Sequence, residues 1–172
     1  MNLNDLDHFK KTDTQNMLAH IDGLPDQLQT AWELGQAQPL PDFSGIQNIV
    51  IAGMGDSALA AELITASISS SIRLPVTVHR NYGLPSFANG KGTLVVCVSH
   101  SGSTEETLDA FETALKIKCR LLVISTGGEL TKRASENDVP VWKYDHKGSA
   151  NASIAFPFGF LLLRFLSPGN RD

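Results

Sequence analysis

One short loop carries most of the residues in this chain that could do chemistry. An apolar run ends at a segment that reads Ser-His-Ser-Gly-Ser-Thr, residues 99–104, and two glutamates follow it. Such a loop before a helix aims backbone N–H groups and the positive end of the helix dipole at one point. Ser99, Ser101 and Thr104 would add hydroxyl donors. We expect the loop to bind a phosphate monoester of a small molecule through neutral donors, since it lacks the lysine of a Walker-type site.

The alternative for this loop is a solvated turn that caps a helix. Residues 103–106, Ser-Thr-Glu-Glu, match the capping box S-x-x-E. A cap needs one hydroxyl, whereas residues 99–104 hold four. This surplus favours phosphate binding, with Gly102 and Ser103 completing the loop. Glu106 fits a role in the cap and the loop better than a role in proton transfer.

A glycine-rich segment at residues 53–57 follows an earlier apolar run. It contains Gly53, Gly55, Asp56 and Ser57. Its pattern G-x-G-x-x-A is that of a dinucleotide site, which needs an acidic residue near the end of the next strand. That place reads His-Arg-Asn, residues 79–81, so only the 2′-phosphate of NADP could be accommodated there. Asp56 would also put a negative charge beside a pyrophosphate. A dinucleotide-binding site is therefore disfavoured. The simpler interpretation is a tight turn between strand and helix that requires glycine.

Two histidines, His79 and His146, each lie at the end of an expected strand and could face a ligand. Together with Glu106 they are the weak candidates for catalysis. If Ser99 and Ser101 point into the site, alternation turns His100 away from it. No Cys/His spacing suits zinc and no carboxylate cluster suits calcium or magnesium, so we expect neither a metal nor another cofactor.

Five short strands must position these loops. Runs rich in Val and Ile without alternation are typical of strands buried on both faces, as in a parallel sheet covered by helices. The prediction is an α/β fold, a three-layer, doubly wound, five-stranded parallel sheet of flavodoxin type with N-terminal helices. The glycine segment of residues 125–128 would join the other two loops at one edge. Strands are expected at 48–52, 76–80, 93–99, 120–125 and 139–144, and helices up to about residue 38, broken at Pro25, and at 57–69, 104–116, 130–136 and 154–166.

The bulk composition indicates one globular domain. The chain has 172 residues, of which 19% are charged and 42% hydrophobic, and its net charge is -4. This charge gives no reason to expect nucleic acid or an anionic membrane as a partner. Two cysteines make no disulfide framework, and no signal-type segment begins the chain, so a cytoplasmic location is expected. The apolar segment 154–166 is too short to span a bilayer. We expect a second copy to cover it in a homodimer or a higher homo-oligomer.

These segments together resemble a sugar isomerase (SIS) domain, a phosphosugar-binding module. Within that family the chain most resembles the N-terminal half of bifunctional phosphoglucose/phosphomannose isomerases. The resemblance spans about residues 14–165 and implies phosphate binding at Gly55, Ser57, Ser99, Ser101 and Thr104. It also implies aldose–ketose isomerisation of glucose 6-phosphate or mannose 6-phosphate with fructose 6-phosphate. The matching segments are GMGDSALAAELI at 53–64, HRNYGLP at 79–85, SHSGSTEETL at 99–108 and ISTGGEL at 124–130.

Three departures from the family pattern bear on activity. Asp56 replaces the third glycine of the first loop, and Ala150-Asn151 replace a Pro-Arg pair whose arginine serves the family's active site. The family's catalytic glutamate, histidine and lysine lie in or beyond a second SIS domain, and this chain is expected to end before it. The alternative function is therefore a sugar-phosphate sensor without turnover, or a truncated remnant. The expected division is a helical extension at 1–44, the SIS domain at 45–166 and a tail at 167–172.

Overall fold

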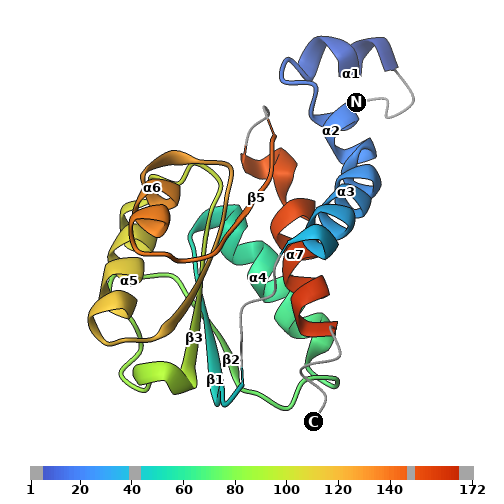
Figure 1. Ribbon diagram of the computed structural model, residues 1–172. Coiled ribbons are helices and arrows are strands. Elements are labelled where there is room, and N and C mark those ends of the chain that lie inside the picture. Colours follow the sequence, from blue (N-terminus) through green and yellow to red (C-terminus); the bar gives the residue numbers. More distant parts are fainter. Residues whose placement is uncertain (1–5, 39–43, 147–149, 167–172) are drawn as a thin grey trace.

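The computed structural model describes residues 6–38, 44–146 and 150–166, which form a parallel sheet with helices on both faces (Figure 1). The sheet order is β2-β1-β3-β4-β5, and every neighbouring pair is parallel. This arrangement confirms the predicted α/β class. The strands are β1 (Asn48–Ala52), β2 (Val76–His79), β3 (Thr93–Ser99), β4 (Arg120–Ser125) and β5 (Val141–Lys143).

The helices differ in where they lie relative to the sheet. Among those of the described residues, α1 and α2 lie away from the sheet, beyond the end of α3 (Figure 1). None of the helices in residues 6–38, 44–146 and 150–166 is both long and apolar enough to cross a membrane. The helices are α1 (Leu6–Thr12), α2 (Met17–Asp22), α3 (Leu24–Ala37), α4 (Gly55–Ile68), α5 (Glu105–Lys116), α6 (Gly128–Glu136) and α7 (Ala155–Leu166), with 3-10 turns η1 (Gly90–Gly92) and η2 (Ala150–Ser153).

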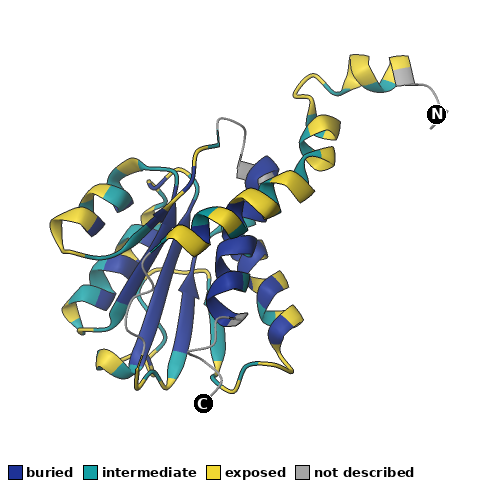
Figure 2. Cartoon of the chain, turned by 45° about the vertical axis from the view of Figure 1, so that its right-hand side comes forward, coloured by how far each residue is buried: buried dark blue, intermediate teal, exposed yellow. Residues whose placement is uncertain are grey.

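The sheet separates two apolar cores, and successive residues of a strand enter different cores. In β1, Ile49 and Ile51 join the core under α4 and α7, while Val50 and Ala52 join the core under α5 and α6. This explains why the strand sequences show no alternation of apolar and polar residues. The three central strands are almost entirely buried, whereas β2 at the edge is half-buried, and many exposed residues lie on the outer faces of the helices (Figure 2). The segment between β2 and β3 contributes Ala88 to the second core.

Prolines and glycines account for the element ends that differ from prediction. Pro25 was expected to divide the N-terminal helices, but the break lies at Gly23 and Pro25 stands in the first turn of α3. Proline is tolerated there because the first N–H groups of a helix have no intrahelical acceptor. The last strand is shorter than expected. Pro140 donates no hydrogen bond and only accepts one, from the N–H of Val123 at 3.0 Å.

Helix α7 lies in the core of its own chain, so it does not need the second copy that was expected to cover it. Helices α3 and α4 pack against α7, and Phe160 and Leu161 are fully buried. A Cβ added at Gly159 would come within 2.8 Å of the Ala31 Cβ, so α3 and α7 approach closely. An apolar helix must be covered, and here two helices of the same chain provide the cover. A homodimer through another surface stays a prediction.

Candidate functional site

The serine loop, residues 99–104, lies at the carboxyl edge of β3. The strand order reverses between β1 and β3, and ligands of doubly wound sheets bind outside the carboxyl ends of strands at such a point. The first glycine loop, residues 53–57, lies on the other side of this point, after β1. The first glycine loop contacts the end of β3, because a Cβ added at Gly53 would lie 2.9 Å from the carbonyl oxygen of Val98.

Hydroxyl groups of the serine loop hold its own backbone. Ser99 is 2% exposed, and its Oγ accepts the N–H of Gly102 at 3.1 Å while pairing with Thr104 Oγ1 at 3.0 Å. The exposed Ser101 accepts the N–H of Ser103 at 3.2 Å through its Oγ. The loop is thereby fixed in a tight turn immediately before α5. First-turn N–H groups of a helix have no intrahelical acceptor and suit an anion.

The expected capping box is wrong. Helix α5 begins at Glu105, so the N-cap is Thr104 rather than Ser103, and no side chain of the described residues makes the cap hydrogen bond. The Thr104 hydroxyl pairs with Ser99 instead. Glu106 lies half-buried in the first turn of α5. With Thr104 as the N-cap, Glu106 does not return a hydrogen bond to the N-cap residue as the glutamate of a capping box would.

The second glycine loop, residues 125–128, packs backbone to backbone against the serine loop. The carbonyl oxygen of Gly102 accepts the N–H of Leu130 at 2.8 Å, and that of His100 accepts the Thr126 hydroxyl at 2.7 Å. Gly102 has a φ of 65°, and a Cβ there would overlap the carbonyl group of Gly127. The sequence placed both loops at one edge, but the requirement for glycine at this contact became visible only in the structure.

The first glycine loop presents Gly55, Asp56 and Ser57 at the start of α4. Gly55 is exposed with a φ of 51°, and the N–H of Ser57 is bonded to the Met54 carbonyl oxygen at 3.1 Å. Asp56 lies half-exposed in the first turn of the helix. A carboxylate there interacts favourably with the positive end of the helix dipole, but it repels a second anion at the same helix end.

The segment after β2 reaches across to α5. The Tyr82 hydroxyl donates to Glu105 at 3.1 Å, which raises the pKa of Tyr82, and the Gly83 N–H donates to Asp109 at 2.5 Å. His79 Nε2 lies 3.3 Å from the Tyr82 carbonyl oxygen, so this histidine supports the segment. Sequence reasoning named Tyr82 only within a matching motif and missed this contact with the start of α5.

Arg80 is the residue that would have to hold the 2′-phosphate of NADP. Its guanidinium group pairs with the Glu62 carboxylate at 2.7 Å. Both side chains are about half exposed, so the pair contributes little to stability. The pairing orients Arg80 toward α4 and gives no support to the dinucleotide alternative.

His146 lies in a cluster of three histidines. Its ring centroid is 6.0 Å from that of His20 on α2 and 5.9 Å from that of His100 in the serine loop. His100 therefore contacts the segment after β5. That it points away from a bound ligand stays a prediction. In the described residues, no group of three or more His, Cys, Asp or Glu side chains could hold a metal ion. The side chain of Asn151, at the place of the family's arginine, lies outside the described residues.

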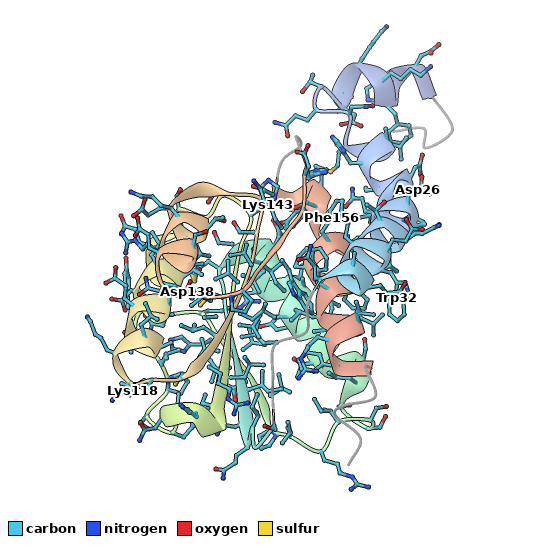
Figure 3. The ribbon with its side chains drawn as sticks, viewed as in Figure 1. Asp26, Trp32, Lys118, Asp138, Lys143 and Phe156 are labelled. Carbon is cyan, nitrogen blue, oxygen red and sulfur yellow. The ribbon has the colours of Figure 1, made fainter. Side chains whose placement is uncertain are left out.

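Aromatic side chains lie near one end of the strands, and charged side chains lie at the other end (Figure 3). Phe156, at the start of α7, stacks on Tyr144 just after β5 with ring centroids 4.8 Å apart. Lys118 and Asp138 lie at the opposite edge, where a cavity of about 550 Å³ also contains Lys91 and Arg120. This cavity with its three cationic side chains and the serine loop lie at opposite ends of the strands.

Comparison with known proteins shows the class of the domain. No family model matches the chain. The fold is similar to that of the Vibrio vulnificus NanR protein complexed with ManNAc-6P, with a TM-score of 0.62, 16% identity and coverage of 89% of this chain and 61% of that one. It is also similar to tagatose-6-phosphate ketose/aldose isomerase from Escherichia coli, with a TM-score of 0.57, 19% identity and coverage of 90% and 44%. The chain therefore has the α/β fold of phosphosugar isomerases.

A sequence match identifies the relatives more narrowly. The chain is 32% identical over 154 residues to the bifunctional phosphoglucose/phosphomannose isomerase of Caldicellulosiruptor bescii, covering 89% of this chain and 45% of that protein. The resemblance to this group, expected from the motifs, is confirmed. The chain spans less than half of the length of the curated relatives that it matches. That it corresponds to their N-terminal half stays a prediction.

Proposed function

We propose that the chain binds a sugar phosphate at the carboxyl edge of β1 and β3, with the phosphate in the serine loop. The main support is the buried Ser99 hydroxyl, which holds the Gly102 N–H and so shapes the loop before α5. Ser101, Ser103 and Thr104 would donate to the phosphate from the loop. On the other side of the ligand, the first glycine loop would contribute Gly53, Gly55 and Ser57. Two of the similar proteins have a sugar 6-phosphate in their names, one as a bound ligand and the other as the substrate of an isomerase. This supports the proposed ligand class.

We propose aldose–ketose isomerisation as the activity of the protein. The relatives' name supports phosphorylated glucose and mannose as the aldoses. We propose the 6-phosphates, with fructose 6-phosphate as the ketose. The reaction needs a ring-opening group and a base that moves a proton between C1 and C2. Of the weak candidates, His79 supports the segment after β2 and His146 contacts two other histidines. Binding without turnover, as in a sensor, is therefore the second candidate for this chain alone.

A proton NMR time course of fructose 6-phosphate with the purified protein separates these functions. Growth of aldose 6-phosphate signals would show turnover by groups of this chain. Broadening of the fructose 6-phosphate signals without conversion would support binding alone. Fructose without its phosphate is the control and is expected to show no broadening. An equal response to fructose and its phosphate would contradict the proposed role of the serine loop.

We also propose a cytoplasmic location and a homodimer that leaves α7 in its own chain. Cys97 and Cys119 are free, which agrees with a reducing compartment. Leu59 and Leu63 lie one turn apart on α4, are 40% and 47% exposed, and offer an apolar face for a second copy. Sedimentation equilibrium at micromolar concentration tests the dimer, and a monomer there would contradict it.

Replacing Ser99 and Ser101 by alanine is expected to affect stability and binding differently. Ser99→Ala leaves the buried Gly102 N–H without its acceptor and is expected to lower the free energy of unfolding by about 1–3 kcal/mol. Ser101→Ala removes an exposed hydroxyl and is expected to change it by less than about 1 kcal/mol. Both variants are expected to bind fructose 6-phosphate at least about tenfold more weakly. Urea denaturation and calorimetric titration measure the two effects, and normal binding by Ser101→Ala would count against the proposed phosphate position.

Removing the charge of Asp56 is expected to strengthen binding. Asp56→Asn takes a like charge away from the phosphate and is expected to tighten fructose 6-phosphate binding by roughly threefold to tenfold. The gain should shrink at high ionic strength because salt screens exposed charges. Asp138→Asn makes the same charge change at the opposite sheet edge and serves as the control. Equal affinity changes in the two variants, measured by calorimetry, would show that Asp56 does not face the ligand.

A further inference from the structure

The histidine cluster joins three distant segments of the chain at the edge that carries the serine loop. His146, after β5, is its central member, and its ring meets the rings of His20 and His100 edge to face at interplanar angles of 65° and 71°. Phe156 lies on another side of His146 with ring centroids 5.9 Å apart. The cluster thus links α2, the serine loop and the start of α7 through aromatic contacts.

Hydrogen bonds fix His100 but leave His146 incompletely paired. His100 Nδ1 lies 3.2 Å from the Tyr144 hydroxyl and 3.0 Å from the Ser153 Oγ. Burial raises the pKa of Tyr144 to about 12, so this phenol stays neutral. His146 Nε2 is buried and has no hydrogen-bond partner among the described residues. A proton added to this nitrogen would therefore lack an acceptor in the docked arrangement.

The charges around the cluster do not compensate for protonation. Asp145 is the carboxylate that favours a charged His146, while burial, His100 and His20 all lower the pKa of His146, with burial the largest cause. Asp13 faces His20, but its carboxylate already accepts the N–H groups of Met17 and Leu18 at 2.7 and 2.8 Å. From η2 and the start of α7, the described groups that face the cluster are the uncharged Ser153 and Phe156.

Helix α2 has little else to hold it against the body of the domain. It contacts α3 and η2 but has no buried residue, and its Leu18 and Ile21 are 52% and 53% exposed. The contact between the rings of His20 and His146 adds a further point of attachment, to the segment after β5. A weakly held element of this kind responds to small changes in free energy.

We propose that the histidine cluster is a pH-dependent clasp, in which α2 lies against the serine-loop edge when His146 is neutral and separates from it when His146 is protonated. The docked state holds His146 neutral, whereas a separated His146 takes up a proton near the ordinary histidine pKa of 6.5. Docking is therefore complete above pH 6.5 and is lost as the pH falls below it. The clasp goes beyond the proposed function because it operates without any ligand.

Amide hydrogen exchange of α2 without ligand tests the clasp at pH 7.5 and 5.5, after correction for the intrinsic effect of pH. In the unmodified protein, protection of α2 relative to α3 is expected to fall severalfold at pH 5.5, because protonation of His146 favours the separated state. The nuclear Overhauser effect between the His20 and His146 rings is expected to disappear over the same range. Unchanged protection together with a persistent ring contact at pH 5.5 would overturn the proposal, and neither result depends on sugar-phosphate binding.

Two variants separate the clasp from a general effect of acid. His146→Phe keeps an aromatic ring beside Phe156 but cannot take up a proton, so its α2 is expected to stay protected at both pH values. His8→Gln changes a histidine on α1, outside the cluster, and is expected to keep the full response of the unmodified protein. Loss of the response in His8→Gln, or a full response in a folded His146→Phe, would contradict the proposal. The nuclear Overhauser measurement on the unmodified protein decides the matter if His146→Phe does not fold.

Discussion

Replacing Gly102 by alanine is expected to abolish sugar-phosphate binding and to lower the free energy of unfolding by about 2–4 kcal/mol. Two causes add. The φ of 65° at this position is strained for a residue with a Cβ, and that Cβ would overlap the carbonyl group of Gly127, whose carbon would lie 2.8 Å away. Backbone forms both sides of this contact, so no side chain can move to relieve it. The serine loop and the second glycine loop would have to separate.

Gly90→Ala is the matched control for this prediction. Gly90 also has a left-handed φ, 60°, but an added Cβ would meet no atom within 4 Å. Gly90→Ala therefore introduces the backbone strain without the overlap. It is expected to lower the free energy of unfolding by only about 1–2 kcal/mol. Chemical denaturation gives the two stabilities, and calorimetry with fructose 6-phosphate gives the affinities. If Gly102→Ala behaved as Gly90→Ala does in both measurements, the close contact of the two loops would be refuted.

Replacing Phe160 by alanine is expected to lower the free energy of unfolding by about 3–5 kcal/mol. The Phe160 ring is fully buried, with its centroid 5.7 Å from that of Trp142 and 6.1 Å from that of Tyr144. Its removal leaves a cavity between α7 and β5 that the rigid sheet cannot close. Urea denaturation followed by Trp142 fluorescence measures the loss. Should the variant fail to fold, Phe160→Leu leaves a smaller cavity and is expected to cost about half as much.

Phe158→Ala tests whether burial within the chain causes this loss. Phe158 lies on the same helix but is only half-buried, so the same truncation removes less apolar contact. Its expected cost is about 1–2 kcal/mol. Equal losses in the two variants would mean that α7 is covered on all sides. That outcome would restore the idea of a partner chain over this helix.

The central strands could be predicted from sequence because their burial leaves a continuous apolar signal. β1, β3 and β4 begin and end at the predicted residues, since each is flanked on both sides and reads as a run of Val, Ile and Leu. The edge strand β5 has fewer partners and a proline before it, so its ends were overestimated. Such local signals also placed the serine loop and both glycine loops at one edge of the sheet.

Contacts between distant segments could not be predicted, because no local pattern encodes them. The apolar character of α7 required a cover but did not say whether α3 and α4 or a second chain would supply it. The same holds for the histidine cluster, whose members come from three separate elements. The Ser99 hydroxyl was expected to face a ligand, whereas its observed partners are Gly102 and Thr104 within the loop.

Mapping of amide NMR shifts during a titration with fructose 6-phosphate tests the central claim most directly. The account predicts the largest changes in the serine loop and the first glycine loop, residues 99–104 and 53–57, and their loss in Gly102→Ala. Inorganic phosphate at equal concentration is expected to perturb the serine loop more weakly, since it lacks the sugar. Changes centred on Lys91, Lys118 and Arg120 would instead place the anion at the opposite sheet edge and contradict the account.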